Sequence, residues 1–147
     1  MIFQTSFVGA GTILDTGTAR RCIEAGATFL TSTGLDLSVV ELCAKENVLV
    51  IPGALTPTEI INAWKAGADL VKAFPCSQLG EVSYLKALRV PLPHGRFVAA
   101  GGVNQGRATD FILAGAVAIG QELIPKKAVQ LRSWIGFKNW RAVSWSL

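Results

Sequence analysis

A single lysine lies inside the short apolar stretch Asp69–Pro75, which reads Asp-Leu-Val-Lys-Ala-Phe-Pro. This pattern predicts a buried strand that carries Lys72 and ends at a proline. Burial disfavours the ammonium form and therefore lowers the pKa of a lysine. The neutral amine is a nucleophile that can form a Schiff base with a carbonyl substrate. The alternative is structural: the stem of Lys72 packs on the strand while its amine reaches water.

The composition indicates one folded domain over residues 1–147. Half of the residues are apolar and 16% are charged, which argues against disorder. No apolar run reaches the roughly 18 residues of a membrane span, and no signal segment opens the chain, so we expect a cytoplasmic protein without a membrane partner. The three cysteines show no CxxC spacing, which is typical of reduced thiols.

The net charge of +4 arises in the C-terminal part of the chain. Residues 126–141 carry five basic residues and no acidic one: Lys126, Lys127, Arg132, Lys138 and Arg141. The rest of the chain is close to neutral, so the sequence does not favour a nucleic-acid partner. Three tryptophans follow Ser133 in the same basic tail, which could lie on a membrane surface but more commonly packs on its own domain.

Six short apolar runs are spaced along the chain as parallel strands would be. They are Ser6–Ile13, Phe29–Gly34, Val48–Gly53, Leu70–Pro75, Arg96–Gly102 and Ala116–Gly120. Helical patterns separate them, and the clearest begins at Thr56-Pro57-Thr58-Glu59, where a cap residue, a proline and a glutamate have capping-box spacing. An Ala-Gly-Ala phrase with its glycine at 26, 67 or 115 ends three of these helices. Alternating strands and helices predict a parallel α/β fold.

Small residues end almost every predicted strand. Gly11-Thr12, Gly34, Gly53, Pro75 and Gly101-Gly102 all fall at such ends. The C-terminal ends of parallel strands form the ligand-binding rim of a (β/α)8 barrel, and a doubly wound sheet binds ligands at the same ends. The Gly9-Ala10-Gly11 phrase lacks the remainder of a dinucleotide fingerprint, so a nucleotide cofactor is not favoured.

In this order the motifs resemble the 2-keto-3-deoxy-6-phosphogluconate / 4-hydroxy-2-oxoglutarate (KDPG/KHG) aldolase family. The matching phrases are Val8-Gly9-Ala10-Gly11-Thr12, Ser32-Thr33-Gly34-Leu35, Ile51-Pro52-Gly53, Lys72-Ala73-Phe74-Pro75 and Gly101-Gly102-Val103. They cover roughly residues 7–130, and the tail 131–147 is atypical. The resemblance implies a (β/α)8 TIM barrel, here a partial barrel of about six parallel strands. It also implies a class I aldolase, usually trimeric, that needs no metal or cofactor.

The resemblance assigns roles to five residues. Lys72 would form the Schiff base with the pyruvyl carbonyl of a keto acid substrate. Thr12 and Phe74 would line that pocket, and Gly101 and Gly102 would hold the phosphate. The implied products are pyruvate and an aldehyde.

The chain also departs from the family pattern. The family's general acid/base glutamate and a substrate-binding arginine belong to the second strand, whereas this chain begins at what resembles the third. Thr33, Ala100 and Gln121 replace residues that are common in the family. Glu81 and Glu122 are possible replacement shuttles, although both are better explained as surface acids, and His94 is expected to be exposed in a turn.

Two other functions therefore stay open beside the aldolase. One is an inactive truncated paralogue that binds an anion or oligomerises through its open edges. The other is a different phosphate-binding barrel enzyme, which would use the glycine loops without requiring Lys72.

Overall fold

The computed structural model describes residues 7–120, in which strands and helices alternate along the chain. The strands are β1 (Gly9–Ala10), β2 (Phe29–Thr31), β3 (Leu49–Ile51), β4 (Gly53–Ala54), β5 (Val71–Ala73), β6 (Phe97–Ala100) and β7 (Ala116–Gly120). The helices are α1 (Thr16–Glu24), α2 (Leu37–Lys45), α3 (Pro57–Lys65), α4 (Val82–Arg89) and α5 (Ala108–Leu113). Short 3-10 turns are η1 (Ser77–Leu79) and η2 (Gln105–Arg107). Gln121, Glu122 and the tail 131–147 lie outside the described residues, and the single domain over 1–147 stays a prediction.

Neighbouring strands are parallel and follow the chain order, in two sheets: β1-β2-β3 and β4-β5-β6-β7. Only Pro52 separates β3 from β4, and a proline has no backbone N–H to donate to the ladder. Its carbonyl still accepts a hydrogen bond from the backbone N–H of Lys72 at 2.8 Å. The predicted third strand is therefore one segment divided at Pro52, which pairs with β2 before the proline and with β5 after it. The predicted partial barrel of about six parallel strands is confirmed.

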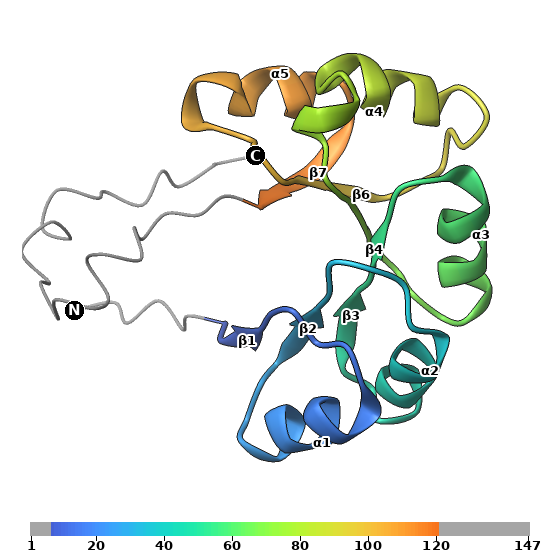
Figure 1. Cartoon of the computed structure of the whole chain (residues 1–147), viewed down its shortest axis with the longest axis vertical. Helices are drawn as coiled ribbons and strands as arrows, with labels where there is room; N and C mark the ends of the chain where they lie inside the picture. Colours follow the sequence, from blue (N-terminus) through green and yellow to red (C-terminus); the bar gives the residue numbers. More distant parts are fainter. Residues whose placement is uncertain (1–6, 121–147) are drawn as a thin grey trace, which may run out of the picture.

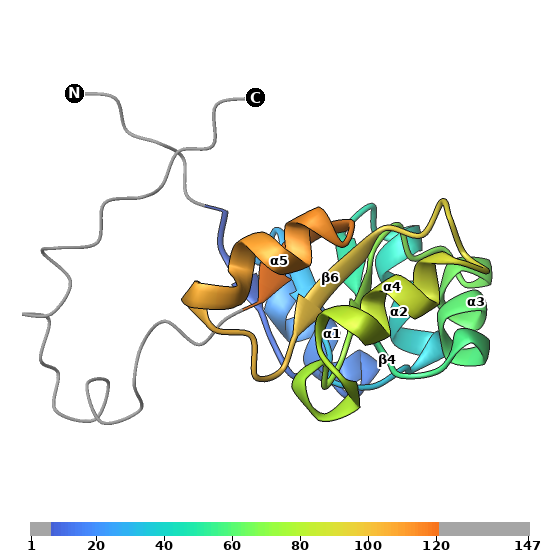
Figure 2. The same cartoon turned by 90° about the horizontal axis from the view of Figure 1, so that it is seen from above.

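The strands form a curved sheet with the helices on its convex side, as Figures 1 and 2 show. Consecutive helices contact one another, α1 with α2, α2 with α3, and α4 with α5. β1 and β7 lie at the two ends of the arc (Figure 1), and the described residues place no further strand beside either of them. The barrel formed by residues 7–120 is therefore open on one side.

Local signals in the sequence set the helix boundaries. The Thr56 hydroxyl caps α3 by accepting from the Glu59 backbone, while the Glu59 carboxylate accepts from the Thr56 backbone at 2.7 Å. The same carboxylate accepts from the Leu55 backbone N–H at 2.8 Å, and the hydrogen bonds from Leu55 and Thr56 lower the pKa of Glu59. Gly26, Gly67 and Gly115 follow the ends of α1, α3 and α5 with φ between 93° and 108°. The Ala-Gly-Ala phrases therefore end helices as predicted, because only glycine adopts such φ values without strain.

The hydrophobic core lies between the convex face of the sheet and the helices. Alternate strand residues such as Leu30, Val71 and Phe97 are fully buried there. They pack with helix residues that are equally inaccessible, including Ile60 and Leu85. Within residues 7–120, no helix is long and apolar enough to cross a membrane.

Candidate active site

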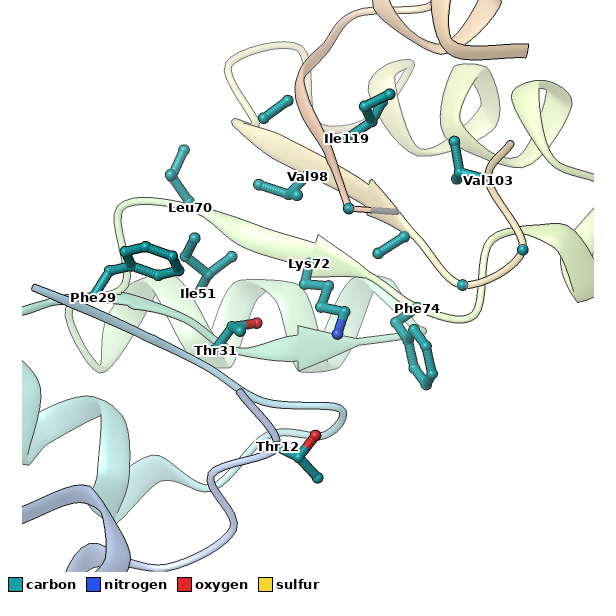
Figure 3. A pocket seen from close by; sticks show the side chains of 15 residues that line it. Thr12, Phe29, Thr31, Ile51, Leu70, Lys72, Phe74, Val98, Val103 and Ile119 are labelled. Atoms are coloured by element: carbon teal, nitrogen blue, oxygen red, sulfur yellow. The ribbon is translucent and has the colours of Figure 1, made fainter. Parts of the chain in front are cut away.

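A cavity of about 890 Å³ occupies the concave face of the sheet. Every strand except the short β1 and β4 contributes a lining side chain (Figure 3). The rest of the wall comes from the loops that follow β1, β5 and β6 and from Leu70, just before β5. The lining residues are Thr12, Phe29, Thr31, Ile51, Leu70, Lys72, Phe74, Val98, Ala100, Gly101, Gly102, Val103, Ala118, Ile119 and Gly120. All five residues to which the resemblance assigned a role therefore surround one cavity.

Lys72 is the middle residue of β5 and its side chain points into this cavity (Figure 3). Its neighbours Val71 and Ala73 point the other way and are fully buried in the core, because successive side chains of a β-strand lie on opposite faces of the sheet. The Lys72 amine lies 4.6 Å from the centroid of the Phe74 ring, a contact that favours the ammonium form. Partial burial acts against that contact and lowers the pKa of Lys72 from its ordinary value. The amine is therefore more often neutral than that of a surface lysine.

The loops after β5 and β6 are held together beside Lys72. The backbone N–H groups of Cys76 and Ser77 donate to the carbonyls of Ala100 and Gly101, at 2.8 and 3.0 Å. Gly101 has φ +82°, and a Cβ added to it would lie 2.8 Å from the Phe74 ring. A side chain at this position would thus both strain the backbone and displace Phe74.

Gly102 is restricted in the same way, since its φ is +78° and an added Cβ would overlap the Ser77 side chain. Glycines allow the backbone N–H groups at this rim to approach a ligand, which is the chemistry that anion binding requires. Cys76 itself is fully buried, does not line the cavity, and its thiol donates to the Ala73 carbonyl at 3.2 Å. Burial raises the pKa of the Cys76 thiol, so Cys76 acts here as a small hydrophobic residue of the core.

Thr12 lies in the loop after β1 and has a left-handed backbone, with φ +60°. The next residue holds this loop on the sheet, because the Ile13 N–H donates to the Thr31 carbonyl at 3.2 Å. Thr31 is a cavity residue that the sequence reasoning did not identify. The spacing of two residues puts Thr31 on the same face as Phe29, but nothing in the sequence shows that this face is the concave one.

The described part of the cavity holds no group that could replace the family's proton-shuttle glutamate. Among residues 7–120, the lining contains no carboxylate and no histidine. Glu81 instead pairs with Arg107 at 2.7 Å and does not line the cavity, and Glu122 lies outside the described residues. His94 is exposed, as expected, and lines a separate hollow with Trp64 and Arg96.

Substituting Gly102 with alanine tests the rim. We expect Gly102→Ala to lower the free energy of unfolding by about 1–3 kcal/mol, because the left-handed backbone and the overlap with Ser77 both oppose a side chain. Denaturant unfolding measures this loss. Gly34→Ala is the matched control, since Gly34 is an exposed glycine whose added Cβ would meet nothing within 4 Å. Equal stability of the two variants would contradict the tight rim geometry.

The chain is similar to known aldolases in both sequence and structure. The family model for KDPG and KHG aldolase matches residues 3–139. A probable 2-dehydro-3-deoxy-6-phosphogalactonate aldolase of Rhizobium meliloti is 36% identical over 77% of this chain and 53% of the relative. A 2-dehydro-3-deoxy-phosphogluconate aldolase of Pseudomonas aeruginosa is 31% identical over 86% of this chain and 59% of the relative.

A solved KDPG aldolase from Legionella pneumophila superimposes with a TM-score of 0.79 at 25% identity. The similarity covers 90% of this chain and 65% of that one, and the Legionella enzyme holds pyruvate as a covalent carbinolamine intermediate. The chain thus spans between half and two thirds of the length of these three relatives. By its sequence motifs, its open parallel barrel and the family match over residues 3–139, the chain belongs to the KDPG and KHG aldolase family.

Proposed function

We propose that the chain carries out class I aldolase chemistry through Lys72, on 2-keto-3-deoxy-6-phosphogluconate or 4-hydroxy-2-oxoglutarate. The observation that carries this proposal is the position of the Lys72 amine, half-buried, with a lowered pKa, and pointing into a cavity. A pyruvate carbinolamine in the Legionella relative is the intermediate that an amine nucleophile and a keto acid would form.

The neutral amine of Lys72 would attack C2 of the keto acid to give a carbinolamine, which loses water to form an iminium ion. Removal of the proton from the C4 hydroxyl then breaks the C3–C4 bond and releases the aldehyde. The electron pair of that bond moves into the iminium and leaves an enamine, which takes a proton at C3. Hydrolysis frees pyruvate and restores the Lys72 amine, so one hard cleavage is divided into easier steps.

Substrate binding would use the other residues around the cavity. The backbone N–H groups of Gly101 and Gly102 would bind the phosphate at the rim, as glycine loops at the C-terminal ends of barrel strands do elsewhere. Thr12 and Phe74 would enclose the pyruvyl part. We further propose a homotrimer, which the family resemblance implies.

A second candidate is a protein that captures pyruvate on Lys72 without cleaving the keto acid. It is favoured by the described cavity lining, which contains no acid or histidine to move the two protons. A missing shuttle lowers the rate of such steps by about 10²–10⁴-fold. The match to an aldolase family argues against the third alternative, an unrelated phosphate-binding barrel enzyme.

Pyruvate release from 2-keto-3-deoxy-6-phosphogluconate separates these candidates. The aldolase proposal predicts steady release by the 147-residue chain that disappears in Lys72→Ala. The capture proposal predicts a borohydride-stable pyruvate adduct with no release above the Lys72→Ala background. Absence of both the adduct and the release would exclude the two candidates together.

A further inference from the structure

Thr31 is a polar group in the cavity to which neither the family resemblance nor the proposed mechanism assigns a role. Of the fifteen lining residues, only Lys72, Thr12 and Thr31 have side chains that can form hydrogen bonds; the others are apolar or glycine. Thr12 lies in a loop, whereas Thr31 is the last residue of β2 and is fixed by the strand. A threonine hydroxyl can both donate and accept hydrogen bonds, so Thr31 is one of the few groups on this wall that can bind a polar ligand.

The surroundings of Thr31 direct its hydroxyl toward the cavity. The methyl group faces Gly11, where an added Cβ would lie 3.5 Å from Thr31 Cγ2. In Figure 3 the hydroxyl oxygen lies on the side of Thr31 that faces Lys72. Among residues 7–120, the structure contains no buried side-chain nitrogen or oxygen that lacks a hydrogen-bond partner. Thr31 lines the cavity, and Figure 3 shows its hydroxyl oxygen on the cavity side of β2, where a ligand can reach it.

The direction of a bound substrate follows from the strand order and rests on the proposed function. β5, which carries Lys72, lies between the segment β3–β4 on one side and β6 on the other, and β2 follows beyond β3. A substrate joined to Lys72 at C2, with its distal phosphate at Gly101 and Gly102 after β6, extends toward β6. Its C1 carboxylate then points the opposite way, toward β2 and Thr31.

The two walls also differ in polarity in a way that suits this orientation. On the β6 side the lining side chains are Val98 and Ala100, which offer no hydrogen bond. On the β2 side Thr31 offers a hydroxyl between the apolar Phe29 and Ile51. A carboxylate accepts a hydrogen bond from a hydroxyl, and such bonds to a charged group are stronger than bonds between neutral groups.

We propose that the Thr31 hydroxyl donates a hydrogen bond to the C1 carboxylate of the keto acid on Lys72. Thr31 thereby selects 2-oxo acids over neutral carbonyl compounds.

Borohydride trapping on the full chain, with pyruvate and with the neutral ketone hydroxyacetone as probes, tests this role. In Thr31→Val, which keeps the shape and removes the hydroxyl, the pyruvate concentration for half-maximal trapping should rise about 10–100-fold, as expected for one bond to a charged group. The hydroxyacetone concentration for half-maximal trapping should change less than about threefold, which is the size of effect that most substitutions without a specific role produce. Thr31→Ser, which retains a hydroxyl, should restore most of the pyruvate affinity.

An equal loss for both probes, or no loss for pyruvate, would overturn the role of Thr31 while leaving Lys72 as the nucleophile. Absence of pyruvate trapping by the unsubstituted chain would overturn the proposed function and this inference together. Circular dichroism checks that each variant is folded, and Thr31→Ala serves as the hydroxyl-free variant if Thr31→Val does not fold. Thr33→Val is the matched control, because Thr33 is a half-buried threonine outside the cavity lining.

Discussion

Replacing Lys72 with methionine is expected to abolish the borohydride-stable adduct that pyruvate forms with the chain. Methionine keeps the length and much of the apolar stem but has no amine, so no carbon–nitrogen bond can form. The expected loss is complete within detection, because the nucleophile itself is removed. Intact-mass spectrometry after reduction measures the adduct directly. The substitution should also be tolerated by the fold, since it removes a partly desolvated ammonium from an otherwise apolar wall.

Lys65→Met provides the control for non-specific lysine chemistry. Lys65 is an exposed residue in the last turn of α3 and does not line the cavity. This variant should form the pyruvate adduct as the unsubstituted chain does. An adduct of equal yield in Lys72→Met would mean that another amine reacts, and Lys72 would then have only a packing role.

Replacing Phe97 with alanine is expected to reduce the free energy of unfolding by about 3–5 kcal/mol, the range for deleting a buried phenylalanine. Phe97 is the first residue of β6, is fully inaccessible, and stacks obliquely on Trp64 with 6.0 Å between ring centroids. Gly95 also lies against its ring, where any side chain would overlap it. Since the described barrel is open on one side, few other contacts can compensate for the space that the deleted Phe97 ring would leave.

Urea unfolding followed by tryptophan fluorescence measures the loss. Leu113→Ala is the matched control, because Leu113 is an aliphatic residue in α5 that is 82% exposed. Its stability should stay within about 0.5 kcal/mol of the unsubstituted chain, as for most surface substitutions. A similar small effect for Phe97→Ala would show that the packing on β6 does not hold the sheet together.

The fold was predictable because its local signals agree with its tertiary structure. The Thr56–Glu59 capping box begins α3 and the glycine after its last turn ends it, as the sequence indicated. The strand runs were predicted longer than the structure shows: Leu70–Pro75 shortens to β5, Val71–Ala73. Apolar composition does not distinguish ladder residues from the loop residues that line a cavity. The third strand is divided at Pro52 because proline has no backbone N–H, and this division could have been predicted from the proline in the sequence.

The site was predictable only in part. The resemblance named Lys72 and four further residues, and the structure brings all five to one cavity, although their roles in binding and catalysis stay predictions. Thr31 was missed because a threonine in a strand is common, and only the curvature of the assembled sheet shows which face is concave. The burial that lowers the pKa of Lys72 likewise depends on side chains from several strands that are distant in sequence.

Peptide mass spectrometry of the reduced pyruvate adduct, formed near neutral pH, tests directly whether Lys72 is the nucleophile. The neutral fraction of an amine rises as pH approaches its pKa, so the lowered pKa of Lys72 should make it react at a pH where exposed lysines stay protonated. We expect the adduct to map to the peptide that contains Lys72, and its rate of formation to reach half of the maximum at a lower pH than for surface lysines. An adduct distributed over exposed lysines such as Lys45 and Lys65, or no adduct at all, would contradict this expectation.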